Sequence, residues 1–175
     1  MLKKWPGILI LDEIKQIRNN QVIFEKNNIH NVLHVQGEEQ ILNALFVGGS
    51  ISNNYIPSFY YLGLDNRLTV SETDTYASIS GEPATSTGYA RQGISSTSGF
   101  SIVTSGSTVK AKSNLIAFSA TTTSWGPVKN LFLTNVVSGS PASARLYSTI
   151  EIGSSITVSV GDQISLIFSM SLKNC

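Results

Sequence analysis

The chain has 175 residues, which suits one domain, and 41% of them are hydrophobic, enough to bury a core without disulfide bonds. Only 13% are charged and the net charge is +1, so the surface offers little repulsion between copies. Direct nucleic-acid binding and a membrane span are not expected, because the basic residues of the second half are scattered and no apolar stretch approaches about 18 residues.

An N-terminal arm or hairpin is predicted over residues 1–36. The segment "RNNQ" at 18–21 indicates a tight turn, since Asn tolerates positive φ, and "VIFEK" at 22–26 alternates apolar and polar residues. Leu11, Ile14 and Ile17 also lie at helical spacing, so a helix stays open, although we favour a hairpin. The segment is too apolar for a free tail. We expect the following residues to contact a neighbouring subunit or another protein: Trp5, Ile8, Leu9, Ile10 and Leu11.

One short helix is predicted at about 38–47, within "GEEQILNALFVGG". Glu38 and Glu39 lie at its start, where the helix dipole favours acidic side chains. Four apolar residues then form one stripe that can pack on a sheet: Ile41, Leu42, Leu45 and Phe46. Gly48 and Gly49 are expected to end the helix.

From residue 59 onward the pattern is that of strands. Eight runs are rich in β-branched and aromatic residues and are separated by Gly, Ser, Asn or Pro: "FYYLGL", "GYARQGI", "FSIVTS", "NLIAFSAT", "VKNLFLTNVV", "ARLYSTIEI", "SITVSV" and "DQISLIFSMSL". Short strands at this spacing favour a β-sandwich or a barrel, and their number suits a jelly roll. We therefore predict a mainly-β, antiparallel, jelly-roll-like sandwich over residues 37–175.

The acidic residues after "FYYLGL" are candidates for chemistry, but a structural role explains them better. The order of Asp65, Glu72 and Asp74 does not match a calcium loop, which needs ligands at alternate positions and a central Gly. "LDNR" reads as a turn, and Ser71 with Asp74 approximates a capping box. No metal or other cofactor is predicted.

Histidine chemistry is also weakly supported. His30 and His34 have the spacing of a helical zinc pair, but the Glu of the zinc-protease motif is replaced by Asn31 and no third ligand is evident. We expect two surface or half-buried histidines and no enzyme, because neither a nucleophile elbow nor a phosphate loop is present. Trp125 in "TSWGP" could stack on a ligand or line an interface, although a hydrophobic plug at one end of the sandwich is favoured.

The order of several segments resembles that of small structural proteins of tailed-bacteriophage virions. These segments are "KNNIHNVLHVQGEEQILNALF", "FYYLGLDNR", "SETDTYASISGEP", "GYARQGIS", "WGPVKNLFLT" and "SVGDQISLIFSMSL", and they cover roughly residues 22–173. The resemblance implies a virion component made in the bacterial host cytoplasm. It implies no catalytic residues. The polar positions that match are Asp65, Asn66, Arg67, Glu82, Tyr89 and Arg91.

Three functions follow as hypotheses. The first is a capsid decoration (cement) protein on the capsid surface that forms a homotrimer, binds the major capsid protein and stabilises the head shell. The second is a tail or head-fibre module that binds host-surface glycans, and the third and least supported is a hydrolase. In either structural role we expect arginines to brace two loops through forked hydrogen bonds to carboxylates. The bracing set is Asp65, Asn66, Arg67, Asp74, Glu82 and Arg91.

Overall fold

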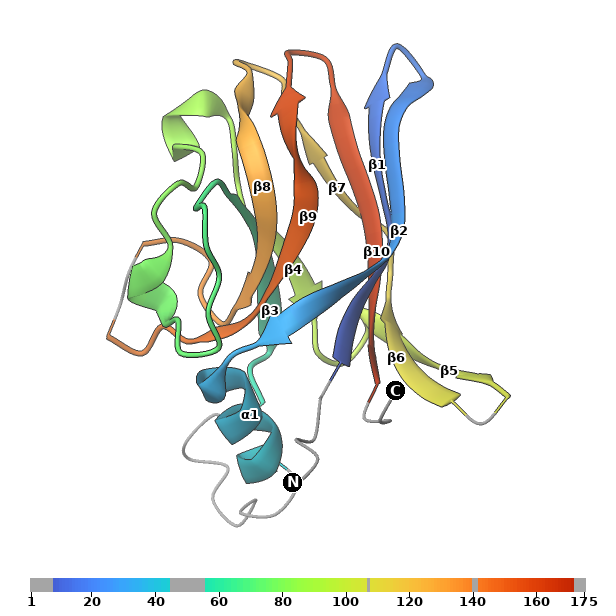
Figure 1. Cartoon of the computed structure of the whole chain (residues 1–175), viewed down its shortest axis with the longest axis vertical. Helices are drawn as coiled ribbons and strands as arrows, with labels where there is room; N and C mark the ends of the chain where they lie inside the picture. The colour runs from blue at the N-terminus through green and yellow to red at the C-terminus, as the bar shows by residue number, and fades with distance from the viewer. Residues whose placement is uncertain (1–7, 45–55, 107, 140–141, 172–175) are drawn as a thin grey trace.

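The computed structural model of the chain describes residues 8–44, 56–106, 108–139 and 142–171. Within these ranges the chain forms ten strands and one α-helix (Figure 1). The elements are β1 (Ile8–Arg18), β2 (Gln21–Leu33), α1 (Val35–Leu42), β3 (Phe59–Asp65), β4 (Gln92–Ser95), β5 (Phe100–Ser105), β6 (Thr108–Ser113), β7 (Ile116–Ser119), β8 (Trp125–Thr134), β9 (Leu146–Val158) and β10 (Gln163–Ser171). Two short 3₁₀ turns, Tyr76–Ser78 and Thr85–Thr87, lie between β3 and β4.

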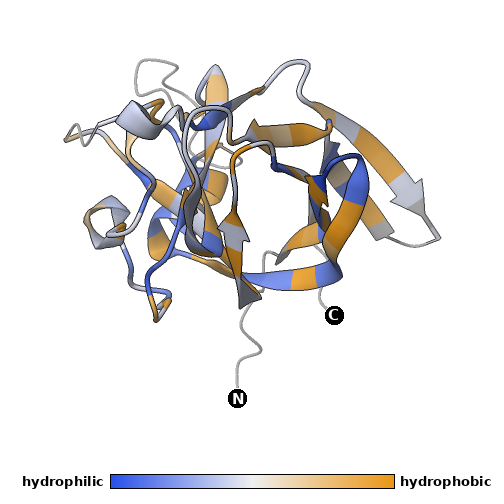
Figure 2. Cartoon of the chain, turned by 90° about the horizontal axis from the view of Figure 1, so that it is seen from above, coloured by the Kyte–Doolittle hydropathy of each residue, from blue (hydrophilic) through white to orange (hydrophobic). Residues whose placement is uncertain are grey.

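All the strands join one antiparallel sheet in the order β4-β3-β8-β9-β2-β1-β10-β6-β5, with β7 also paired to β10. The sheet curls until it is almost closed, as the view from above shows (Figure 2). The predicted mainly-β antiparallel fold is therefore confirmed. A sandwich of two separate sheets is not, because β2 pairs with β1 over most of its length and with β9 through Asn31–Leu33. Strand β2 therefore joins the β4-β3-β8-β9 part of the sheet to the β1-β10-β6-β5 part.

The N-terminal segment forms the predicted hairpin. Asn19 and Asn20 make its turn with φ angles of 50° and 61°. The hairpin is not a separate arm, however, because β1 lies between β2 and β10. The side chains of Leu11 and Ile14 are fully buried in the chain's own core. The boundary predicted after residue 36 thus falls inside α1 and assigns strands of one sheet to two parts.

The predicted elements differ from the observed ones in three respects. Helix α1 begins at Val35, three residues before the predicted start, and Leu45 and Phe46 lie outside the described residues. Strand β6 was not predicted, because two lysines break the apolar pattern of "TVKAKS". The runs "ARLYSTIEI" and "SITVSV" are one long strand, β9. Gly153 adopts a φ of 72° within β9 and does not end the strand.

Two apolar clusters occupy opposite faces of the β3–β8–β9 region. The main core lies inside the curled sheet and contains, among others, Leu62, Leu131 and Phe168. A smaller cluster on the outer face consists of Tyr76, Phe132, Ala144 and Leu146. Phe132 lies so close over Gly63 that a Cβ there would approach its ring to 2.2 Å. The long connection between β3 and β4 covers this outer face and carries the candidate site.

Candidate functional site: two buried arginine networks

The first network begins where β3 ends. Register places Asp65 opposite Asn130 of β8, and the Asp65 side chain is fully buried. Asp65 Oδ1 accepts hydrogen bonds from the backbone N–H of Arg67 at 2.8 Å and from Asn130 Nδ2 at 2.9 Å. Asn130 Nδ2 also donates to the carbonyl of Arg67 at 2.9 Å. These contacts fix the turn that was predicted from "LDNR".

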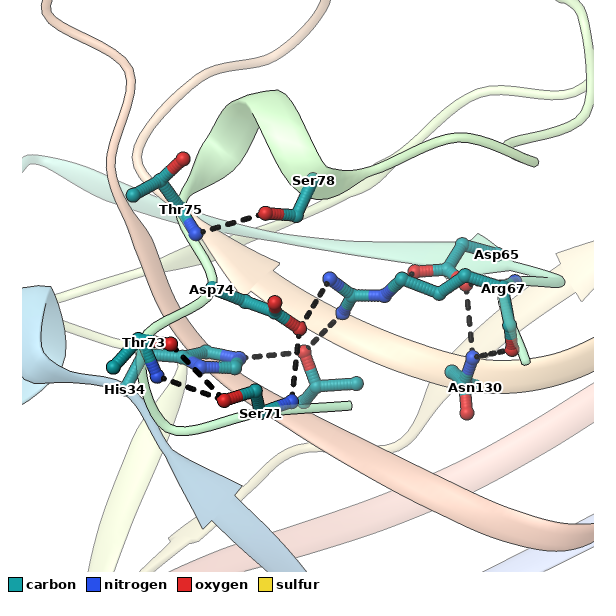
Figure 3. A network of polar contacts seen from close by, with 10 residues as sticks. His34, Asp65, Arg67, Ser71, Thr73, Asp74, Thr75, Ser78 and Asn130 are labelled. Atoms are coloured by element: carbon teal, nitrogen blue, oxygen red, sulfur yellow. Dashed lines mark hydrogen bonds and ion pairs between the residues drawn. The ribbon is translucent and has the colours of Figure 1, made fainter. Parts of the chain in front are cut away.

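Arg67 connects this turn to two other segments (Figure 3). Its Nε lies 3.0 Å from Asp65 Oδ2, and its Nη1 lies 3.1 Å from Asp74 Oδ2. Its Nη2 donates to Thr149 Oγ1 in β9 at 2.6 Å. Asp74 Oδ2 also accepts from the N–H of Ser71 at 3.0 Å, which closes the "SETD" turn. One guanidinium thus holds two carboxylates and a neighbouring strand.

His34, between β2 and α1, completes the first network. Its Nε2 is 2.8 Å from Thr149 Oγ1, and the residue is fully buried. Burial lowers the pKa of His34, and the positive charge of Arg67 lowers it further, while Asp74 and the carbonyls of Ser71 and Glu72 act in the opposite direction. Thr149 Oγ1 accepts a hydrogen bond from Arg67, and its own hydroxyl proton can therefore be donated to Nε2 of a neutral His34 ring.

The second network is centred on Arg91, just before β4. Arg91 forms a forked contact with Glu82: Nε donates to Oε1 at 2.7 Å and Nη2 to Oε2 at 2.6 Å. Nη1 donates to the carbonyl of Val136 at 2.9 Å, and Nη2 also contacts the Tyr76 hydroxyl. The guanidinium carbon lies 5.2 Å and 5.3 Å from the ring centres of Tyr76 and Phe132, within cation–π range.

Tyr89 ties the second network to the sheet. Its hydroxyl donates to Glu82 Oε1 at 2.9 Å and accepts from the backbone N–H of Leu64 at 2.9 Å. Burial raises the pKa of Tyr89, and the charge of Glu82 raises it further, so the phenol stays protonated. Leu64 directly precedes Asp65, and the two networks therefore meet at the end of β3.

Asn66 lies between the networks and differs from the other predicted bracing residues. It is half-buried, and its side chain packs against Gly81, where a Cβ would come within 1.5 Å of Asn66 Oδ1. Its contribution is therefore close packing of the two loops, which requires glycine at position 81. The five charged members of the predicted set are all engaged in the two networks.

Not all of the predicted interface residues are available to a partner. Leu11 and Trp125 are buried within the chain itself, and this corrects their assignment to an interface. Trp125 packs edge-to-face with Tyr89 at 5.5 Å and donates from Nε1 to the carbonyl of Thr87 at 3.2 Å, as expected of a plug. Ile10 is half-buried, and Ile8 and Leu9 begin β1 opposite Ser171 and Met170. Trp5 lies outside the described residues.

Sequence reasoning missed four members of the networks. Asn130 and Thr149 lie on the distant strands β8 and β9, His34 lies between β2 and α1, and Tyr76 lies in the 3₁₀ turn that follows Asp74. It also missed an ion pair outside the two networks, in which Arg18 makes two hydrogen bonds to Asp162, at 2.6 and 2.8 Å. Gln16 and the N–H of Ser159 also donate to Asp162, and these contacts lower its pKa to about 2, with the Arg18 bond as the largest cause. In the sequence, the Gly-Asp turn of "SVGDQ" was the one local pattern that could have pointed to Asp162. His34 itself had been expected at the surface or half-buried.

The two networks hold together segments that lie apart in the chain. Each carboxylate of the two networks is paired with an arginine. Surface hollows of about 310 Å³ and 340 Å³ adjoin Arg67 and Arg91. Among the described residues, no cluster of three His, Cys, Asp or Glu side chains could hold a metal ion, and no helix is long and apolar enough to cross a membrane.

Comparison of the chain with protein-family models, with curated proteins and with solved structures gives no match. The function must therefore be argued from the chain's own residues.

Proposed function

We propose that this chain is a structural protein of a tailed-bacteriophage virion that decorates the outside of the capsid. There it forms a homotrimer, binds the major capsid protein and stabilises the shell. Because it binds the assembled shell and not free capsid subunits, its binding free energy adds to the stability of the assembled form. The proposal includes no catalytic activity.

One observation carries the structural role. The carboxylates of the two networks are all paired with arginines: Asp65 and Asp74 with Arg67, and Glu82 with Arg91. An active or binding site leaves at least one such group facing a substrate. Here the charged groups instead fasten a long connection onto the outer face of the sheet.

The phage assignment draws on the sequence blocks that form these networks. "FYYLGLDNR" supplies Asp65 and Arg67, "SETDTYASISGEP" supplies Asp74 and Glu82, and "GYARQGIS" supplies Arg91. The blocks that resemble virion proteins are therefore the ones that the fold brings together at the end of β3. The glycan-binding alternative loses its main candidate, because Trp125 is buried beneath Tyr89 and the carbonyl of Thr87.

The copy number per particle tests this proposal. Purified phage particles that carry the chain are analysed by quantitative mass spectrometry, with the major capsid protein as the internal standard. Hundreds of copies per particle, together with a lower shell melting temperature in particles lacking the chain, are expected. A small number fixed by tail symmetry would reassign the chain to the tail, and absence from particles would end the virion proposal.

A further inference from the structure

Strand β5 is one end of the sheet, and within the described part of the chain no strand pairs with its outer edge. Its other edge pairs with β6 in an uninterrupted register from Phe100 opposite Ser113 to Ser105 opposite Thr108. The β5–β6 hairpin extends away from the body of the molecule in both views (Figures 1 and 2). Among the described residues, the outer edge therefore has no strand partner and can accept another chain.

This edge lacks the features that normally prevent strands from pairing between molecules. Natural edge strands are protected by charged side chains, proline, bulges or very short length. The sequence "FSIVTS" has no charge and no proline, and its six residues pair with β6 without a bulge. Two of its β-branched residues are exposed, Ile102 by 71% and Val103 by 41%. Strand β4 at the opposite end of the sheet is only four residues long.

The charges around the edge favour a second copy of this chain as its partner. Two β5 strands related by a two-fold axis can pair antiparallel, and no like charges then face each other, because β5 carries none. The nearest lysines, Lys110 and Lys112, lie on β6, one strand further in. Two registers are possible. If the two-fold axis passes at Ile102, Ser101 lies opposite Val103 and Phe100 opposite Thr104 of the second copy. If the axis passes at Val103, Ile102 lies opposite Thr104.

We propose that β5 is a self-association edge at which two copies of the chain pair their β5 strands antiparallel and form one continuous sheet. Six residues per copy make a contact smaller than a standard interface of about 1,600 Å². The pairing is therefore concentration-dependent, and it becomes strong where copies are held close together. A two-fold contact of this kind doubles the number of copies in any oligomer that the other surfaces of the chain form.

The test combines an edge variant with a matched control. Ile102→Lys places like charges opposite each other beside the two-fold axis, whereas Val137→Lys adds the same charge at a residue that is 58% exposed and lies outside the strands. Sedimentation velocity across a concentration series should show that the full chain doubles its mass. Ile102→Lys should weaken this doubling by at least about tenfold and Val137→Lys should leave it unchanged.

Cysteine cross-linking gives the register. In a Cys175→Ser background, either Ile102→Cys or Val103→Cys should form a disulfide-linked dimer under mild oxidation, and the variant that reacts marks the two-fold axis. Doubling that Ile102→Lys does not affect, or the absence of both doubling and cross-linking, would overturn the inference. The result does not depend on the virion proposal, because a chain that is absent from particles could still double through β5.

Discussion

The two arginine networks have similar burial but different charge balance. The Arg67 and Arg91 side chains are only 6% and 5% exposed. Arg91 meets a single carboxylate in a fork, and its remaining donors reach a carbonyl and a hydroxyl. Arg67 is shared between Asp65 and Asp74, and its contact with Asp65 Oδ2 is an ion pair without a hydrogen bond. The first network therefore depends more on charge, and the second more on directed hydrogen bonds.

The comparison predicts that Arg67→Ala has the largest effect. Removing the guanidinium leaves Asp65, which has no solvent exposure, without a cation. Breaking a buried ion pair in this way costs about 3–5 kcal/mol. Urea unfolding should show this loss in the free energy of unfolding. Adding Asp65→Asn to Arg67→Ala should recover part of it, because the stranded charge is then removed. No recovery in the double variant would contradict the role assigned to charge.

Arg91→Ala should come second, with a loss of about 2–3 kcal/mol, because Glu82 is 21% exposed and can regain water when its partner is removed. Arg91→Lys keeps the charge but loses the fork, so it should recover only a minor part of the loss. Urea unfolding of both variants beside Arg67→Ala checks this order. If Arg91→Ala costs more than Arg67→Ala, packing of the guanidinium over Tyr76 and Phe132 outweighs charge balance, and the comparison fails.

The sequence predicted the parts of these networks that are close in the chain. Arg67 lies two residues from Asp65 and seven from Asp74, and Arg91 lies nine from Glu82, so turns alone can bring them together. Asn130 and Thr149 join only through the registers of β3 with β8 and of β8 with β9. No local pattern encodes those registers, and the distant partners were therefore missed.

The same limit applies to the fold. Alternation and turn residues predicted most strands, because each strand buries one face and turns at Gly, Asn or Ser. They did not predict that β1 would insert between β2 and β10, since pairing between residues 146 to 163 positions apart leaves no trace in the local pattern. The apolar run that suggested an arm reflects, in part, Leu11 inside the core.

The smallest predicted effect is the pH dependence of the free energy of unfolding that His34 causes. It distinguishes the two networks because, in the described part of the chain, only the first contains a histidine. The folded state holds the pKa of His34 below its ordinary value of 6.5, so the unfolded chain binds the proton more readily. The stabilisation is therefore complete above about pH 6.5 and declines as the pH falls through the lowered folded pKa. Protonation would place a second positive charge beside Arg67 and disturb the hydroxyl of Thr149, whereas no histidine contacts Arg91 among the described residues.

Urea unfolding between pH 7.5 and about pH 5, above the range in which most carboxylates titrate, measures this dependence. The native chain should lose stability across the window, and His34→Gln should be less stable at pH 7.5 but nearly independent of pH. His30→Gln is the matched control, because His30 is exposed on β2, and it should keep the native slope. Arg91→Ala should also keep that slope, since its network has no histidine. Arg67→Ala should flatten it, because one cause of the lowered pKa is removed. Equal slopes in the native chain and His34→Gln would show that the first network does not sense pH through this residue.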